Sequence, residues 1–483
     1  MQMPLVGVAP IVEEYAPLFQ DCFENICQYR HFENYLTGLI TLPNKTMTNI
    51  SRCILNSADK TNLSRFFSQA PWEESAVNDR RLELMLNETT SKRLAAKDSA
   101  LIIDDTMCEH VGSLFDFIDR HYNHTDSTFP LAHNVINSYY VSGPVRFPVN
   151  GYLYRRFEEI THWPDFVNKH FPELVLPSKS KERAKLHEKL APTLLQDPEF
   201  AALNAQFQTK IDLAVKLVED AVAHQVPFEL LLIDSWFLCP QLLEAAKRHK
   251  KDLLSILKSN RNLETNSFTL RDEAGQPITL KGPHISVAKL LPLIPPSAYQ
   301  AVEVNGKTYW CFTLTVCIPS LGKVRLVISQ DKRDLSGRCA ALVSNRTDWS
   351  AKQIVSKYLL RWPIETFYQD SKQLLGFNEY RMRSAEAFGK HWCLVYVAYS
   401  LLHLESLRGE TKPLSTPAFK NEEEEAIKIL PAKSIGQVCR EQARCLMESL
   451  ILKAHDLLAG GHTVQAVFDF LFAKQSLPST TTG

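Results

Sequence analysis

The sequence predicts an α/β protein with a β-rich insertion and helical regions at both ends. Two short apolar runs, Ala100–Ile103 and Phe228–Ile233, have the composition of buried strands. Between them, residues 207–223 repeat apolar side chains at the 3.6-residue spacing of an amphipathic helix. Residues 265–345 are rich in strand and turn signals, and helical patterns dominate after Ser350. Strands that alternate with helices are typical of α/β cores.

The order of these elements narrows the fold class further. Strand candidates at 100–103, 134–141 and 145–154 precede the helix at 207–223, and the strand at 228–233 follows it. Three strands, a helix and a further strand are the opening order of a ribonuclease-H-like core. In the β-rich segment we expect strands at 301–304, 309–316 and 323–329, separated by turns at Asn305-Gly306 and Leu321-Gly322. The predicted units are a helical N-terminal domain (1–95), the first part of the core (96–264), a β-rich insertion (265–345), the second part of the core (346–385) and a helical C-terminal region (386–483).

For the two terminal regions the sequence predicts helices but no specific arrangement or function. Residues 1–95 carry 9 basic and 11 acidic residues, so charge gives no support for DNA binding by this segment. Its short amphipathic pieces on either side of Ser57–Asn62 suit a helix-turn-helix and a small helical bundle equally well. Near the C-terminus we expect an acidic loop at Glu422–Glu425 and a flexible tail of small polar residues.

Composition excludes several classes of protein. The 483 residues are 45% hydrophobic and 22% charged, which is ordinary for a globular protein of about three structural units and excludes a mainly disordered or fibrous one. Lys plus Arg and Asp plus Glu number 54 each, so the chain is no uniformly basic coat for nucleic acid, although local basic patches remain open. P-loop, esterase and zincin motifs are absent from the sequence.

The sequence also bears on location. Residues 1–15 have no basic segment of the kind that begins a secretory signal, and the longest apolar run, Trp392–Leu402, has 11 residues where a membrane span needs roughly 20. The eleven cysteines include no C-x-x-C pair, so we expect free thiols in a reducing, cytoplasmic setting.

Three acidic residues stand where catalytic groups are expected. Asp105 and Asp234 each follow a predicted buried strand, at the end where α/β folds present ligand-binding groups. The third acid is Glu365, in a segment that we expect to begin as a helix with a capping box formed by Ser350 and Gln353. On a continuous helix, Tyr358, Arg361, Glu365 and Lys372 fall within about 60° of one another. Pro363 interrupts or restarts that helix, but Glu365 and Lys372 both lie beyond it.

This pattern suits metal-assisted phosphoryl transfer. Two Mg²⁺ ions roughly 4 Å apart need shared carboxylates and stabilise the attacking and leaving oxygens of an in-line displacement. Arg361 can form a two-pronged contact with a phosphate, Lys372 supplies a point charge, and Tyr358 can donate a hydroxyl.

The same residues carry a family resemblance. Tyr358-x2-Arg361-x3-Glu365-x6-Lys372 resembles the Y-(2)-R-(3)-E-(6)-K signature of the DDE transposases of bacterial insertion sequences, the IS-four superfamily. Asp104-Asp105-Thr106 after one strand, Asp234-Ser-Trp236 after another and the β-rich insertion between the second acid and Glu365 are also similar. These motifs span residues 105–383, more than half of the chain, and the four-residue signature is the specific part.

The resemblance implies a cut-and-paste DNA transposase. Asp105, Asp234 and Glu365 become the metal-binding catalytic triad, with Asp104 as the rival for the first position; Asp105 is preferred because it directly precedes Thr106. Water would attack a phosphodiester at the transposon end, and the freed 3′ hydroxyl would attack the opposite strand to form a hairpin and later the target DNA. The implied cofactor is Mg²⁺, for which Mn²⁺ can substitute. The implied partners are the terminal inverted repeats and target DNA, bound by a homodimer at the nucleoid, with the C-terminal helices as the dimer contact.

DNA contacts are expected from two groups of residues. Tyr358, Arg361 and Lys372 would hold the terminal phosphates, with Arg381 and Arg383 just beyond them. Some relatives insert a tryptophan where a base has left the stack; Trp310 is the candidate, and Trp236, Trp349 and Trp362 remain open, although packing is the simpler role for Trp236 and Trp362.

Other patterns have ordinary explanations beside the functional ones. Lys181, Lys185 and Lys189 follow helical spacing, and they suit either a solvated helix face or DNA contact. Residues 231–262 carry a local excess of three positive charges, which makes DNA contact attractive there. Cys108-Glu-His110 and His121-x-x-His124 could suggest zinc, but the ligand spacing is incomplete. The competing functions are a domesticated relative that binds DNA without cutting it and a two-carboxylate hydrolase such as a glycosidase.

Overall fold

A computed structural model describes residues 2–55, 60–94, 96, 98–123, 126–408 and 433–475. Its central feature is a mixed ten-stranded sheet in the order β2-β3-β1-β5-β6-β12-β11-β10-β9, with β4 also paired to β3. In the described part of the chain, each helix is too short or too polar to cross a bilayer.

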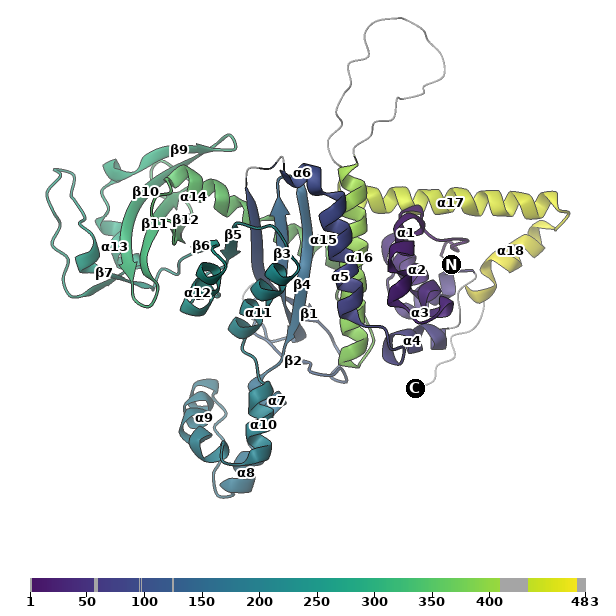
Figure 1. Cartoon of the computed structure of the whole chain (residues 1–483), viewed down its shortest axis with the longest axis horizontal. Coiled ribbons are helices and arrows are strands. Elements are labelled where there is room, and N and C mark those ends of the chain that lie inside the picture. Colours follow the sequence, from purple (N-terminus) through teal and green to yellow (C-terminus); the bar gives the residue numbers. More distant parts are fainter. Residues whose placement is uncertain are drawn as a thin grey trace, which may run out of the picture.

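Five strands form the core of this sheet (Figure 1): β1 (Ser99–Glu109), β3 (Leu131–Ser142), β4 (Val145–Tyr154), β5 (Leu230–Ile233) and β6 (Asp252–Ile256). β3 is antiparallel to β1 and β4, whereas β1, β5 and β6 run parallel. The four strands predicted in this region are confirmed. β1 extends past its acidic residues because β3 pairs with it along its whole length, while β5 pairs only with residues 100–103. The short β2 (Asp119–Arg120) pairs with the start of β3.

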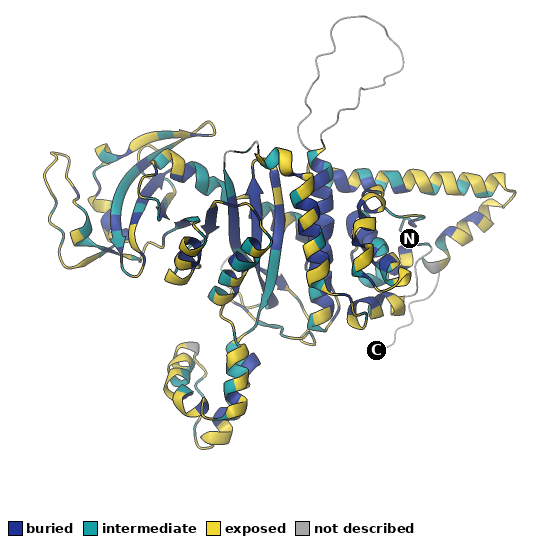
Figure 2. Ribbon diagram, in the orientation of Figure 1, coloured by how far each residue is buried: buried dark blue, intermediate teal, exposed yellow. Residues whose placement is uncertain are grey.

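Helices cover both faces of the core sheet (Figure 1). One face carries α11 (Lys210–Ala223) and α12 (Pro240–Arg248), and the other carries α5 (Glu74–Glu88), α15 (Pro363–Leu374) and α16 (Ala385–Leu407). α16 is buried along almost its whole length, since it lies between the sheet and the N-terminal helices (Figure 2). The apolar run at 392–402 is therefore the centre of a buried helix, as its composition on all sides requires.

The predicted β insertion extends the core sheet. β9 (Gln300–Val304), β10 (Lys307–Ile318) and β11 (Gly322–Gln330) match the expected strands, and β12 (Cys339–Ser344) is an additional one. β12 pairs with β6, so the insertion continues the sheet of the core. Asn305 and Gly306 both have positive φ at the β9–β10 turn, as two-residue hairpins require. β7 (Asn262–Glu264), β8 (His284–Ser286) and α13 (Val287–Leu290) complete this region.

A second insertion projects below the sheet (Figure 1). It consists of α7 (Phe157–Thr161), α8 (Trp163–His170), α9 (Ser180–Leu194) and α10 (Pro198–Gln206). Six buried residues form a small core of its own: Trp163, Phe166, Val167, Leu190, Leu194 and Phe200. Lys181, Lys185 and Lys189, which follow helical spacing in the sequence, lie in α9, but the sequence does not predict a separate core here.

The N-terminal helices pack against the C-terminal ones. α1 (Pro10–Tyr15), α2 (Ile26–Thr41) and α4 (Lys60–Ser68) lie beside α16, and α3 (Met47–Cys53) packs against α2 and α4. α17 (Ile435–Ala459) contacts both α16 and α2. α6 (Thr90–Leu94) leads into β1, and α18 (Val464–Phe472) follows α17. The expected break at 57–62 lies partly outside the described residues, and the acidic loop at 422–425 and the C-terminal tail lie wholly outside them.

Candidate active site

The register of the parallel strands brings two of the acids together. Ile103 on β1 is the partner of Ile233 at the end of β5, so Asp104 and Asp234 are the next residue along each strand. Successive side chains of a strand point to opposite faces, and Asp105 therefore points away from Asp104. The backbone N–H groups of Trp236 and Phe237 donate to Asp234 Oδ1 at 2.9 and 3.1 Å and fix that carboxylate.

Glu365 and Asp104 share one ion-pair partner, Arg361. One Arg361 nitrogen lies 2.7 Å from Asp104 Oδ2, and the other terminal nitrogen lies 2.8 Å from Glu365 Oε1. The two carboxylates come from β1 and α15, more than 250 residues apart in sequence. Arg361 thus connects the first and third acidic positions of the sequence pattern on the α15 face of the sheet.

The electrostatics of the site reflect crowded negative charge. Burial raises the pKa of Asp104 to about 7, and the charges of Asp234, Asp105 and Glu365 add to this rise against the lowering effect of Arg361. Burial also raises the pKa of Asp234, and the charge of Asp105 contributes. Carboxyl groups that raise one another's pKa in a buried site are common in catalytic centres.

The signature segment is not one continuous helix. α14 (Ala351–Tyr358) begins with the predicted capping box of Ser350 and Gln353, a 3₁₀ turn covers Leu359–Arg361, and Pro363 is the first residue of α15. Proline is well suited to the first helical position because its missing N–H would have no partner there. Arg361 and Glu365 still meet across the junction.

Asp105 has a different set of neighbours on the α11 face. Its Oδ2 lies 2.6 Å from Lys210 Nζ and accepts a hydrogen bond of 2.9 Å from Asn134 Nδ2. The structure therefore separates the two adjacent aspartates: Asp104 faces Arg361 and Glu365, and Asp105 faces Lys210 and Asn134.

The donor set is the kind that Mg²⁺ prefers. Asp104, Asp234 and Glu365 supply carboxylate oxygens, and burial keeps the pKa of Asp104 raised even with Arg361 beside it. Among the described residues, no three His, Cys, Asp or Glu side chains are grouped closely enough to hold one metal ion. Arg361 lies between two of these carboxylates, and its displacement is needed before they can share an ion.

Of the other predicted DNA-binding residues, Tyr358 lies beside Arg361, whereas Lys372 and Arg381 act on Cys108 and His110, further along the chain from Asp104. Burial raises the pKa of the half-buried Tyr358, whose hydroxyl lies near the Arg361 guanidinium. Lys372 is half-buried on α15, while Arg381 and Arg383 are exposed beyond it. No ion pair involves these three cations in the part of the chain that the structure describes.

The tryptophans differ sharply in exposure. Trp362 and Trp236 are 69% and 48% exposed, whereas Trp349 is 6% exposed and buried. Trp310 is half-buried on β10, with the Arg333 guanidinium 5.4 Å from its ring.

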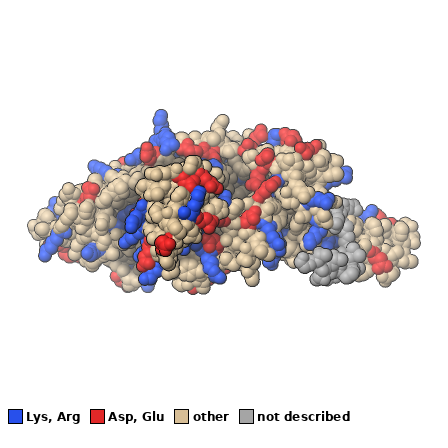
Figure 3. All heavy atoms as spheres, turned by 90° about the horizontal axis from the view of Figure 1, so that it is seen from below, with Lys and Arg blue, Asp and Glu red and all other residues tan. Residues whose placement is uncertain are grey.

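The alternative sites from the sequence gain no support. Cys108 is buried, burial raises the pKa of its thiol to about 12, and it contacts the Phe377 carbonyl, so it is a poor zinc ligand. His124 lies outside the described residues. Lys181, Lys185 and Lys189 are exposed on α9. Basic and acidic side chains are interspersed over the lower face of the molecule (Figure 3).

Sequence reasoning missed a buried network that supports the active-site strand. The Tyr368 hydroxyl donates to the Asp104 carbonyl at 3.0 Å, Asn137 Nδ2 donates to Tyr368 at 3.4 Å, and Tyr396 donates to Asn137 Oδ1. A Cβ on Gly151 would lie 2.7 Å from Asn137 Oδ1 and overlap the Tyr396 hydroxyl. Tyr368 lies within the signature helix, but nothing in the sequence indicates its partners.

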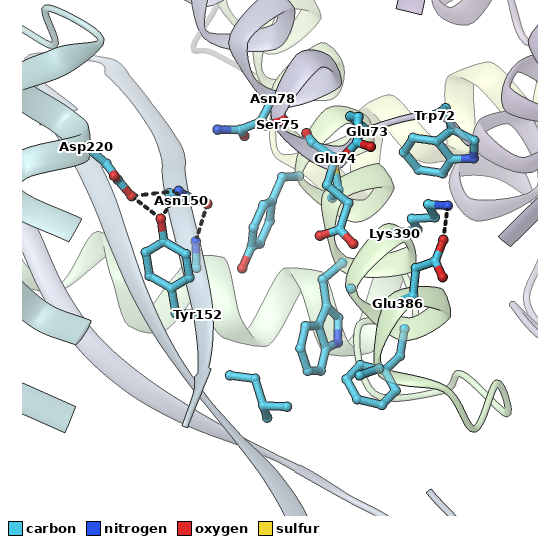
Figure 4. A pocket seen from close by; sticks show the side chains of 18 of the residues that line it. Trp72, Glu73, Glu74, Ser75, Asn78, Asn150, Tyr152, Asp220, Glu386 and Lys390 are labelled. Carbon is cyan, nitrogen blue, oxygen red and sulfur yellow. Dashed lines mark hydrogen bonds and ion pairs between the residues drawn. The ribbon is translucent and has the colours of Figure 1, made fainter. Parts of the chain in front are cut away.

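A cleft of about 880 Å³ lies away from the three acids, between α5, α16 and β4. Its walls carry Asp220, bonded to Asn150 and Tyr152, and the ion pair of Glu386 with Lys390 (Figure 4). Asp104, Asp234 and Glu365 do not line it.

Comparisons with known proteins place the chain in a family. A family model described as "DDE superfamily endonuclease" matches residues 18–289, and one described as "Transposase DDE domain" matches residues 208–401. A comparison with curated proteins finds no match. The first model covers more than half of the chain and the second includes Asp234 and Glu365, so the protein belongs to the DDE endonuclease superfamily and is a DDE transposase.

Proposed function

We propose that this transposase excises and inserts a DNA element by cut-and-paste transposition, with Asp104, Asp234 and Glu365 as its metal-binding acids. The observation that carries the proposal is the connection of Asp104 to Glu365 through Arg361, beside the parallel-strand neighbour Asp234. Asp105 has the better position in the sequence motif, but its contacts with Lys210 and Asn134 support a role outside the triad. The strand order β4-β3-β1-β5-β6 supports a ribonuclease-H-like core.

Divalent ions bound by these acids would supply Lewis-acid stabilisation of the attacking and leaving oxygens. The protein's own residues place the three carboxylates close to one another and bind the DNA phosphate beside them. Water attacks the phosphorus at the element end, and the bond to the 3′ oxygen breaks to leave a 3′ hydroxyl. That hydroxyl then attacks a phosphodiester of the opposite strand, which forms a hairpin and releases the flanking DNA with a 3′ hydroxyl. Water opens the hairpin and restores the 3′ hydroxyl of the element, which attacks a phosphodiester of target DNA and displaces a 3′ hydroxyl of the target strand. Membership in the IS-four superfamily is part of this proposal, and the spacing of Tyr358, Arg361, Glu365 and Lys372 supports it.

Basic residues beyond the acids suit the phosphates of the element end. Arg361 would exchange Asp104 for a phosphate, which frees Asp104 for the metal. Lys372, Arg381 and Arg383 add positive charge further along the chain. Because these contacts are electrostatic, DNA affinity should fall steeply with salt. Trp310 stays a candidate for contact with an unstacked base.

The C-terminal helices suit dimer formation. α17 and α18 expose Met447, Ile451, Leu452, Val464, Phe468 and Phe470. Exposed apolar side chains on two consecutive helices are typical of a surface that another chain covers. We propose that a second copy of the protein covers these side chains when two element ends are held together. We further propose that the protein acts in the cytoplasm.

Plasmid cleavage tests the function. A supercoiled plasmid that carries the inverted repeats flanking the gene is incubated with Mg²⁺ or Mn²⁺ and wild type, Glu365→Ala or Glu303→Ala. Glu303 is an exposed acid on β9, and its variant should cleave like wild type, while Glu365→Ala should not cleave. Equal cleavage by wild type and Glu365→Ala would refute the nuclease assignment. Binding without cleavage by the wild type would instead favour a domesticated DNA-binding protein.

A further inference from the structure

Two contacts join Asp104 to the segment that carries Glu365. The Asp104 carboxylate pairs with Arg361, which also pairs with Glu365. The Asp104 backbone carbonyl accepts a hydrogen bond of 3.0 Å from the hydroxyl of Tyr368, three residues after Glu365 on α15. The first contact depends on a long, flexible side chain, whereas the second joins the backbone of β1 to a buried ring. The proposed reaction uses the first contact and leaves the second unexplained.

The ion pairs of Arg361 cannot hold the two acids while they share a cation. The guanidinium lies between the Asp104 and Glu365 carboxylates, so it has to leave Asp104 before a divalent ion takes its place. From then on, the two carboxylates come from separate elements without a common ion-pair partner. The Tyr368 hydrogen bond involves neither carboxylate, so it persists when the guanidinium moves. It is therefore suited to hold β1 and α15 in place relative to each other.

The sheet supports Asp104 less than it supports the residues before it. β5 ends at Ile233, and its pairing with β1 ends at Ile103. From Asp104 onward, β1 pairs with β3. The Tyr368 hydroxyl supplies a donor to the carbonyl at the position where the parallel ladder has just stopped. Such a donor matters because a buried carbonyl without a partner costs stability.

A chain of buried side chains orients the Tyr368 hydroxyl. The Tyr396 hydroxyl on α16 donates to Asn137 Oδ1, which fixes the orientation of the amide. The Asn137 Nδ2 group then donates to the Val135 carbonyl at 3.2 Å and to the Tyr368 oxygen at 3.4 Å. Because the Tyr368 oxygen accepts this bond, its single proton is left for the Asp104 carbonyl. Burial raises the pKa of Tyr368 well above its ordinary value, so the hydroxyl keeps that proton.

We propose that Tyr368 is a positioning residue for the metal site, whose hydrogen bond to the Asp104 carbonyl fixes the Asp104 carboxylate at the distance from Glu365 that a shared divalent ion requires. Asn137 and Tyr396 orient its hydroxyl. This role rests on the proposed function, because it takes Asp104 and Glu365 as metal ligands. Loss of one buried hydroxyl should therefore weaken metal binding, although that hydroxyl is not itself a ligand.

Isothermal titration of the full-length protein with Mn²⁺, without DNA, measures this role separately from activity. Tyr368→Phe keeps the ring and removes only the hydroxyl, and it should weaken Mn²⁺ binding by roughly 10- to 100-fold, the usual effect of losing a residue that supports a metal ligand. The Mn²⁺ concentration that gives half-maximal cleavage of the end-bearing plasmid should rise by a similar factor. Asp104→Asn, titrated in parallel, should also weaken Mn²⁺ binding.

Tyr399→Phe is the matched control. Tyr399 on α16 is buried, and its hydroxyl is hydrogen-bonded to that of Tyr139 at 3.0 Å, outside the chain that leads to Asp104. Each variant removes one buried hydroxyl, so urea unfolding should show lower stability for both, while only Tyr368→Phe weakens Mn²⁺ binding. Wild-type Mn²⁺ binding by Tyr368→Phe, or equal weakening by Tyr399→Phe, would overturn the proposal.

A second variant tests the same role if Tyr368→Phe does not fold. Tyr396→Phe keeps the Tyr368 hydroxyl but removes the donor that orients Asn137, so it should bind Mn²⁺ more weakly than Tyr399→Phe. Where both variants fold, combining Tyr396→Phe with Tyr368→Phe should add little further loss, because both act through one hydrogen bond. Wild-type Mn²⁺ binding by Tyr396→Phe, or fully additive losses, would contradict the proposed chain.

The two proposals fail in different ways. If Asp104→Asn binds Mn²⁺ as tightly as wild type, Asp104 is not a ligand and the proposed set of acids fails. If Asp104→Asn weakens Mn²⁺ binding and Tyr368→Phe does not, only the positioning role of Tyr368 fails.

Discussion

Replacement of Asp104 by asparagine should make the protein more stable and catalytically inactive. The variant keeps an amide oxygen that can accept from Arg361 but removes a charge from a buried, crowded site. The rise of the Asp104 pKa from 3.8 to about 7 corresponds to about 4 kcal/mol of unfavourable free energy for the charged form in the folded protein.

The pH dependence of this gain follows from the direction of the shift. Below about pH 3.8 the Asp104 carboxyl is protonated in both the folded and the unfolded chain, so its ionisation does not change the free energy of unfolding. As the pH rises, the unfolded chain releases the proton first, and the wild type loses stability until the folded carboxyl also ionises near pH 7. Asp104→Asn should therefore gain about 2 kcal/mol over wild type at pH 5 and up to about 4 kcal/mol at pH 8.

Thermal and urea unfolding at these two pH values measure the gain, with Asp105→Asn as the matched control. Asp105 is partly exposed and paired with Lys210, so its replacement should cost about 1 kcal/mol or less. The reasoning would be refuted if Asp104→Asn were no more stable than wild type at pH 8, or if Asp105→Asn gained as much. Cleavage of the end-bearing plasmid should be lost in Asp104→Asn and retained at a reduced level in Asp105→Asn.

Three further predictions concern structure and metal binding. Gly151→Ala should lower the free energy of unfolding by about 1–3 kcal/mol, because the new Cβ would collide with the hydrogen-bonded Tyr396 hydroxyl and Asn137 side chain. Urea unfolding measures this change. Gly7→Ala is the control and should change the free energy little, because a Cβ at Gly7 would meet nothing within 4 Å. Arg81→Met should cost about 3 kcal/mol or more, because fully buried Arg81 donates to Asn78, Ser400 and the carbonyls of Pro148 and Val149. Arg80→Met, at a largely exposed salt bridge, should cost about 1 kcal/mol or less. Mn²⁺ affinity, measured by isothermal titration, should fall as the pH drops below 7, because Asp104 must release its proton to bind a cation; a pH-independent affinity would exclude Asp104 as a ligand.

The neutral overall charge conceals local features that matter more than the total. Acidic and basic residues are interspersed on the lower face (Figure 3), while Arg381 and Arg383 are exposed in the segment that follows α15. A net charge of zero over the whole chain therefore does not exclude a local binding surface for DNA.

Short-range patterns in the sequence determined most of the secondary structure. The apolar run at 100–103, the alternation at 134–154 and the Asn305-Gly306 turn each depend on neighbouring residues, so they could be predicted locally and are present in the structure. The capping box at Ser350 and the restart of the helix at Pro363 are equally local. The predicted membership in the DDE transposases, which the family models confirm, was also carried by a local pattern, since Tyr358 and Lys372 lie within 15 consecutive residues.

Tertiary structure decided the rest, because strand register and side-chain partners depend on residues far apart in the chain. The contacts of Asp104 and Asp105 are the clearest case: the sequence motif favours Asp105, which directly precedes Thr106, but in the folded chain Asp104 shares Arg361 with Glu365. Our proposal of Asp104 as the first acid rests on this contact. Lys210 gave no signal in the sequence, since its contacts with Asp105 and Trp236 join residues 105 and 26 positions away. Sequence thus determined which chemical groups the protein has, and the folded sheet decided which of them face one another.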